Sequence, residues 1–158
     1  MLQLARTQQP APVPAAPEPL GRLLDDLENR RHGLFARDGR RLDFPVAPEL
    51  RSVPVPGRPL AQILDILLDN ARGHGNGHGS VEVSARDLAD AVALDVRDEG
   101  AIRTDPTALF ARGHTTGTGA GIGLAPAREI AEAAGGRLVL ANHEPTTFTL
   151  LIPLCGSE

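Results

Sequence analysis

The chain contains no lysine, because all 16 of its Lys and Arg residues are arginine. This absence excludes a Walker A phosphate loop, which needs a lysine on the phosphates. It also excludes the usual protein-kinase fold, which places a strand lysine on the phosphates, and a pyridoxal enzyme, which holds its cofactor as a lysine Schiff base. Any fold assigned to this sequence must therefore work without an ammonium side chain.

Composition further restricts the kind of protein that this chain can be. A chain of 158 residues that is 41% hydrophobic suits one domain with a modest core. A net charge of -4 and the absence of Trp and Tyr argue against nucleic-acid binding. Cys155 is the only cysteine, which excludes an intramolecular disulfide framework. Because no apolar run resembles a membrane span or a signal peptide, we expect a cytoplasmic chain without direct membrane contact.

Periodicity organises the chain into a tail and one domain. Residues 1–18 are rich in proline and alanine and are predicted to be a linker or disordered tail, with the domain over 19–158. Helices are predicted over 19–31, 58–72 and 122–134. Strands are predicted over 80–86, 91–97, 137–141 and 147–154, with a further hairpin over 34–46 that turns at Asp38-Gly39. This order predicts an α+β fold, a two-layer sandwich in which about three helices cover one face of a mixed sheet.

The second predicted helix carries a polar stripe beside its apolar one. Gln62, Ile66, Asn70 and His74 are spaced by four and therefore share a face that is not the core face. The amide oxygen of Asn70 is a hard, neutral ligand that suits Mg²⁺, which keeps most of its waters and bridges phosphates. The alternative for Asn70 is a surface or capping role.

Asp98 follows a predicted strand and precedes Gly100. A carboxylate in this position can accept a hydrogen bond from the amino group of adenine, and a glycine lets the base approach the backbone. The alternative is a turn aspartate that merely ends a strand.

A glycine-rich run opens the third predicted helix at Gly119, Gly121 and Gly123. Free N–H groups at a helix N-terminus bind phosphate, and glycines permit close approach. A dinucleotide-binding fingerprint is excluded because no strand precedes the run and its spacing is not G-x-G-x-x-G. Thr115 and Thr116 are candidate hydroxyl donors to phosphate. The alternative is a plain flexible loop.

Four motifs follow one another in a fixed order. They are Leu67-Leu68-Asp69-Asn70-Ala71 with His74, Val96-Arg97-Asp98-Glu99-Gly100, Leu109-Phe110-Ala111-Arg112, and Gly117-Thr118-Gly119-Ala120-Gly121-Ile122-Gly123-Leu124. Together they resemble the N, G1, F and G2 boxes of the GHKL ATPase superfamily. The chain looks most like the catalytic, ATP-binding domain of bacterial sensor histidine kinases, and the resemblance covers residues 19–154.

The resemblance implies a Bergerat-type ATP-binding fold with ATP and Mg²⁺ as cofactors. It implies that Asn70 holds the magnesium and that Asp98 selects adenine. His74 resembles a residue that contacts phosphate or the lid, although a histidine among glycines is equally a solvated loop residue, and Arg112 is equally a surface arginine. The implied nucleotide site comprises Asn70, His74, Asp98, Gly100, Arg112, Thr115, Thr116, Gly119, Gly121, Ile122, Gly123 and Leu124.

The implied partner is a phosphoacceptor domain that this sequence lacks. No segment resembles an H-E-x-x-R-x-P-L box, so the chain is expected to offer the γ-phosphoryl group of ATP to a histidine on a separate dimerisation domain, and indirectly to a response regulator. Any membrane anchor would belong to the parent kinase.

The sequence also departs from the family pattern. Ile66 stands where members that hydrolyse ATP alone, such as DNA gyrase, place a glutamate as general base, so hydrolysis is expected to be poor. Ile102 replaces the last glycine of the G1 box, and Gly73 replaces a basic residue. Two alternatives therefore stay open, an anti-sigma-type serine protein kinase and a catalytically silent nucleotide-binding pseudokinase.

Overall fold

The computed structural model describes residues 16–73, 79–100, 110 and 124–154. Its centre is a five-stranded sheet in the order β2-β4-β5-β7-β6. The strands are β2 (Leu42–Asp43), β4 (Val81–Asp87), β5 (Ala91–Asp98), β6 (Arg137–His143) and β7 (Thr146–Pro153). Because β2 runs parallel to β4 while the other neighbours are antiparallel, the sheet is mixed.

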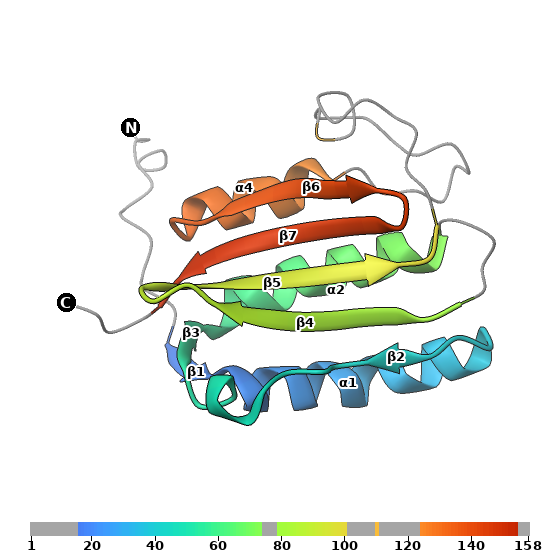
Figure 1. Ribbon diagram of the computed structural model, residues 1–158, viewed down its shortest axis with the longest axis horizontal. Helices are drawn as coiled ribbons and strands as arrows, with labels where there is room; N and C mark the ends of the chain where they lie inside the picture. The colour runs from blue at the N-terminus through green and yellow to red at the C-terminus, as the bar shows by residue number, and fades with distance from the viewer. Residues whose placement is uncertain (1–15, 74–78, 101–109, 111–123, 155–158) are drawn as a thin grey trace, which may run out of the picture.

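The α-helices in the described residues are α1 (Leu20–Arg37), α2 (Gly57–Gly73) and α4 (Ala125–Ala133), and Figure 1 shows them behind the sheet. None of them has the length and apolarity that a membrane span requires. The α+β sandwich predicted from the sequence is confirmed.

A small second sheet joins the start of the domain to α2. In it, β1 (Pro17–Pro19) pairs with β3 (Pro54–Pro56), which follows the short 3₁₀ helix η1 (Pro48–Leu50). Pro17 and Glu18, which were assigned to the N-terminal linker, are thus part of a strand, whereas residues 1–15 lie outside the described residues.

The core lies between the helices and one face of the sheet. Strand residues alternate in their environment, as expected for a sheet covered on one face. The inward positions are apolar and almost fully buried: Val81, Val83, Val92, Leu94, Val96, Leu138, Phe148, Leu150 and Ile152. The helices supply leucine and isoleucine stripes from the other side: Leu20, Leu23, Leu24, Leu27, Leu60, Ile63, Leu64, Leu67 and Leu68.

The hairpin predicted over residues 34–46 is wrong. Instead α1 continues to Arg37, which places Phe35 in the core with 1% of its surface exposed. Asp38-Gly39 does form a turn, but this turn ends the helix, since Gly39 has φ +72 and the next residue, Arg40, donates its N–H to the Phe35 carbonyl. The chain then forms β2, which pairs in parallel with β4 rather than with a preceding strand.

The end of α4 is also closed by glycine. Gly135 has φ +83, and Gly136 donates its N–H to the Ala131 carbonyl. A Cβ on Gly136 would collide with the backbone carbonyl oxygen of Leu151 on β7. The close approach of β6 to β7 therefore requires glycine at this position.

We predict that Gly136→Ala lowers the free energy of unfolding by about 1–3 kcal/mol, because the colliding carbonyl belongs to a central strand and cannot move away. Gly33→Ala is the matched control. Gly33 lies in α1 with no atom within 4 Å of a built Cβ, so its replacement should raise stability by about 0.5–1 kcal/mol. Urea denaturation of both variants measures the two effects, and equal changes would contradict this account of Gly136.

Candidate functional site

Buried polar side chains gather at one end of the molecule. In the described part of the chain the buried polar or charged residues are Arg40, Asn70, Asp98, Thr146 and Thr149. Thr149 lies in the middle of β7, where its hydroxyl donates to Asp95 at 2.6 Å. The other four lie where β5 and α2 end and where β4 and β7 begin (Figure 1). Because burying polar groups costs free energy, this concentration marks a candidate site.

Asp98 is the last residue of β5, and 4% of its surface is exposed. Its Oδ1 atom accepts a 2.6 Å hydrogen bond from the N–H of Gly100. The Gly100 carbonyl in turn accepts the N–H of Thr146, the first residue of β7, at 3.0 Å. The turn after β5 is thereby tied to β7, which holds the carboxylate at the junction of β4, β5 and β7. This hydrogen bond also fits a turn aspartate, but a solvated turn does not require such burial.

Thr146 is fully buried, and its hydroxyl donates to the His143 carbonyl at 3.3 Å. Thr146 is not among the residues predicted from the sequence. It occupies the same face of β7 as Phe148, Leu150 and Ile152. A polar residue at an inward position of an otherwise apolar strand is the signal that could have identified it.

Asn70 lies in the last turn of α2 with 7% of its surface exposed and its Oδ1 atom buried. Ile66, one turn earlier, is partly buried and packs against the core. An amide oxygen in this position fits Mg²⁺, which binds few protein oxygens and completes its shell with water and phosphate oxygens. Among the described residues, Asn70 is therefore a candidate ligand for such an ion.

Two arginines near the end of α2 make contacts within the protein. Arg72 pairs with Asp38 at the end of α1, with 2.7 Å between Nε and Oδ2, and this hydrogen bond lowers the pKa of Asp38. Arg40 is buried, and its guanidinium donates to the carbonyls of Ala71 and Gly79. Arg40 cannot be recognised from the sequence, because its partners are backbone atoms that leave no pattern there.

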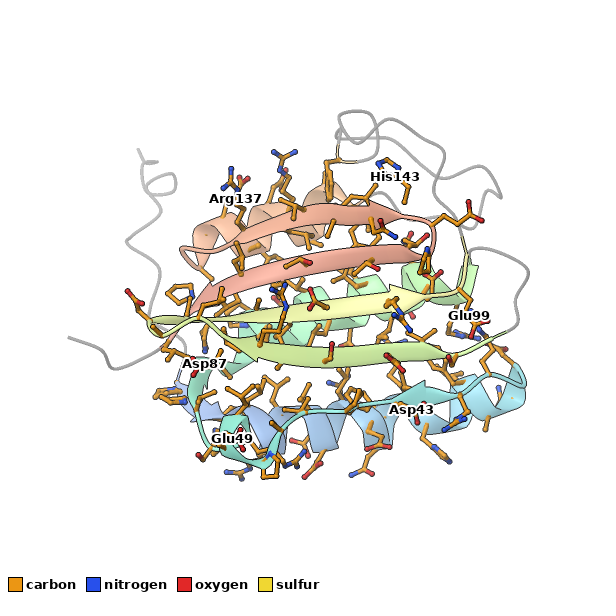
Figure 2. The ribbon with its side chains drawn as sticks, viewed as in Figure 1. Asp43, Glu49, Asp87, Glu99, Arg137 and His143 are labelled. Atoms are coloured by element: carbon orange, nitrogen blue, oxygen red, sulfur yellow. The ribbon has the colours of Figure 1, made fainter. Side chains whose placement is uncertain are left out.

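Glu99, next to Asp98, accepts hydrogen bonds from both the N–H and the hydroxyl of Ser80, each at 3.0 Å. These two hydrogen bonds lower the pKa of the Glu99 carboxyl group. Gly79, with φ +85, precedes Ser80, and a side chain on it would collide with the Glu99 carboxylate. Figure 2 shows Glu99 where β5 ends beside the start of β4.

Phe110 packs on the core with 8% of its surface exposed. Its ring meets that of Phe148 on β7 edge to face, at a centroid distance of 6.1 Å. The Arg128 guanidinium of α4 lies 5.2 Å from the centroid of the Phe110 ring, a cation–π contact. Phe110 therefore contacts both β7 and α4, and its partner Arg128 is not predicted by any sequence pattern.

The structure thus brings Asn70, Asp98 and Gly100 to one end of the sheet. Leu124 precedes α4 and is fully buried in the core cluster. The remaining candidates lie outside the described residues: His74, Arg112, Thr115, Thr116, Gly119, Gly121, Ile122 and Gly123. Ile102 lies outside them as well.

Comparison of the chain with a family model and with a curated relative indicates the same family. Residues 56–156 match the family model described as histidine kinase-, DNA gyrase B-, and HSP90-like ATPase. The chain is 35% identical over 162 residues to the Probable sensor histidine kinase HK of Mycobacterium tuberculosis. That alignment covers 98% of this chain but only 41% of the relative, so the chain spans less than half of the relative's length.

Solved structures share the fold. The nucleotide-free catalytic domain of histidine kinase ThkA gives a TM-score of 0.76 at 23% identity, over 87% of this chain and 95% of that domain. Full-length ShkA in complex with AMPPNP gives a TM-score of 0.78 at 22% identity, over 95% of this chain and 33% of that protein. At these identities the likeness establishes the fold alone.

We predict that the Glu99→Gln variant loses less free energy of unfolding than wild type when the pH is lowered. A carboxyl group whose folded-state pKa lies below its usual value stabilises the fold above the unfolded-state pKa. That contribution is lost as pH falls through the lowered folded-state pKa, which lies below 4.5. The measurement is urea denaturation at pH 6 and at about pH 3, where wild type should lose more stability than the variant.

Glu49→Gln is the control for the change in net charge, since Glu49 lies at the opposite end of the molecule in Figure 2. A Glu99→Gln protein whose stability falls as steeply as that of wild type would show that the Ser80 contacts do not stabilise the carboxylate.

Proposed function

The chain belongs to the family of histidine kinase-, DNA gyrase B- and HSP90-like ATPases, and from this premise we propose that it binds ATP with Mg²⁺ and donates the γ-phosphoryl group to a histidine of a separate dimerisation domain. Within the family it is a histidine kinase-type ATPase domain. The observation that carries the proposal is that Asp98 and Asn70, which come from separate motifs, are both buried at the same end of the sheet.

Asp98 is proposed to read the adenine. Its carboxylate accepts a hydrogen bond from the Gly100 N–H, which fixes its rotamer before any ligand arrives. A carboxylate oriented in this way can accept a hydrogen bond from the exocyclic amino group of adenine, and a guanine offers a carbonyl at the same position. The absence of a Cβ on Gly100 leaves room for the base next to the backbone.

Asn70 is proposed to hold the magnesium ion on the phosphates. The ion, when bound, would neutralise part of the phosphate charge and so favour transfer of the γ-phosphoryl group. The glycine-rich segment with Thr115, Thr116 and Arg112, and His74 after α2, remain the predicted contacts to the phosphates. The similar ShkA structure is in complex with AMPPNP, which supports nucleotide binding by proteins that contain this fold.

Transfer to an acceptor is favoured over hydrolysis. Ile66, one turn before Asn70, is apolar and packs against the core, so its side chain cannot activate water. We propose that the attacking imidazole comes from a dimerisation domain, and that a response regulator receives the phosphoryl group from that histidine. The membrane attachment of any parent kinase would lie outside this domain.

A second function, nucleotide binding without transfer, is favoured by a specific contact. The family pattern has a basic residue at position 73, where this chain has Gly73. The neighbouring cation, Arg72, is paired with Asp38, so it is engaged within the protein instead of replacing that residue. A pseudokinase would therefore bind ATP through Asp98 and Asn70 but leave the γ-phosphoryl group in place.

We predict that the chain binds ATP with Mg²⁺ and that Asp98→Asn weakens binding by about 10- to 150-fold, the cost of a lost hydrogen bond to a charged group (about 1.5–3 kcal/mol). Asn70→Ala should weaken binding only when Mg²⁺ is present. Calorimetric titration with and without the ion measures both effects.

Asp95→Asn is the matched control, because Asp95 lies on the same strand but pairs with Arg86 and Thr149 instead. It should bind ATP as wild type does. A folded wild-type sample that gives no heat with ATP and no competition by ADP would overturn the nucleotide site.

We predict that γ-labelled ATP, the chain and a panel of histidine kinase dimerisation domains yield a phosphoryl group on an acceptor histidine. Phosphohistidine is labile in acid and stable in alkali, so acid treatment identifies it. An acceptor domain with its histidine replaced by alanine is the control. Acid-stable label on serine would favour the anti-sigma-type serine kinase, and ATP binding without any label would favour the pseudokinase.

A further inference from the structure

Arg40 is the one arginine that is buried in the described part of the chain, with 6% of its surface exposed. Burying a guanidinium is unfavourable unless its N–H groups find acceptors. Within the described residues the Arg40 guanidinium donates to two backbone carbonyls rather than to carboxylates. Arg40 is therefore not explained as a member of a surface ion pair.

The first acceptor is the carbonyl of Ala71, at 2.8 Å from Nη1. Ala71 directly follows Asn70 and lies in the last turn of α2, where carbonyls lack intrahelical partners. A cation there also complements the partial negative charge of the helix end. Arg40 thus caps the turn of α2 that carries Asn70.

The second acceptor is the carbonyl of Gly79, at 3.2 Å from Nε. The next residue, Ser80, donates its N–H and its hydroxyl to Glu99. Glu99 directly follows Asp98. A continuous series of contacts therefore leads from Asn70 through Arg40 and the start of β4 to Asp98.

The position of Arg40 is itself fixed by the fold. Its N–H donates to the Phe35 carbonyl as part of the turn that ends α1, and the carbonyl of the next residue, Arg41, accepts the N–H of Val81 on β4. After the hydrogen bonds from Arg72 to Asp38 and from Ser80 to Glu99, the charge of Arg40 also helps to lower the pKa of both carboxyl groups. The guanidinium is therefore held between α1, α2 and β4.

We propose that Arg40 is a positioning residue of the nucleotide site, which sets the placement of Asn70 relative to Asp98 by fastening the end of α2 to the start of β4. This inference rests on the proposed function, since Asn70 and Asp98 are its magnesium and adenine residues. Arg40 itself contacts neither the ion nor the nucleotide. The planar guanidinium of arginine can donate to two carbonyls at once, and the ammonium group of lysine cannot fully replace it.

The test is calorimetric titration of the full chain with ATP, with and without Mg²⁺. Arg40→Met should weaken Mg²⁺-dependent binding about tenfold or more, because a small misplacement of a ligand group is costly. Binding without the ion should change less. Arg40→Lys, which retains the charge and one hydrogen bond, should recover part of the loss.

Arg51→Met is the matched control. Arg51 also donates to a backbone carbonyl, that of Gly21 at 3.1 Å, and to the Asp25 carboxylate at 2.8 Å. These contacts lie at the N-terminal end of α1, whereas Arg40 follows its C-terminal end. If Arg40 only stabilises the fold, both Met variants lower the free energy of unfolding and neither changes ATP affinity beyond about twofold.

The double variant Arg40→Met with Asn70→Ala separates positioning from general damage. If Arg40 acts through Asn70, its replacement should cost little further Mg²⁺-dependent affinity once Asn70 is absent. Fully additive losses, or wild-type affinity in a folded Arg40→Met protein, would overturn the inference and leave the proposed function intact. Absence of ATP binding by wild type would overturn the proposed function and this inference with it.

Discussion

The packing of α2 against the inner face of the sheet is the interaction on which the candidate site depends. Leu60, Ile63, Leu64, Leu67 and Leu68 are each at most 1% exposed, and such a continuous stripe permits one rotation of the helix about its axis. That rotation places Asn70 at the edge of the core instead of within it. The end of β5 carries Asp98 into the same region, because the burial of Val92, Leu94 and Val96 fixes which face of that strand packs on the core. The position of both site residues is thus a consequence of apolar packing.

Arginine makes many of the contacts between elements that are distant in the sequence. Arg31 reaches Asp65 and Asp69 and so joins α1 to α2, while Arg51 joins the loop after η1 to the start of α1. A guanidinium presents several N–H groups in a plane, so one side chain can bind two acceptors. Exposed pairs of this kind contribute little stability individually. Their effect is to fix the relative positions of helix ends, and a lysine-free chain has only arginine for this task.

Most helices and strands could be predicted from the sequence, but the contacts that position the side chains of the candidate site could not. Helices and strands follow from apolar spacing, which is local, and the motifs around Asn70 and Asp98 are local as well. The hairpin predicted over residues 34–46 is wrong because the burial of Phe35 and the pairing of Asp38 with Arg72 of α2 favour continuation of the helix to Arg37, and both contacts depend on distant residues. Arg40 and Arg128 were not predicted for a related reason, since their partners are a backbone carbonyl and an aromatic ring far along the chain.

The packing of the partly buried Ile66 against the core affects how a site of this kind would use ATP. A nucleotide site that hydrolyses ATP needs a base within reach of water, and the position one turn before Asn70 is the one from which a helix could supply it. Here that position is occupied by a side chain that packs against the core, so a carboxylate could be introduced only at the cost of that packing. A domain that binds ATP without activating water would retain the γ-phosphoryl group until an acceptor supplies its own nucleophile. The same apolar packing that orients Asn70 would therefore also protect the bound nucleotide from hydrolysis.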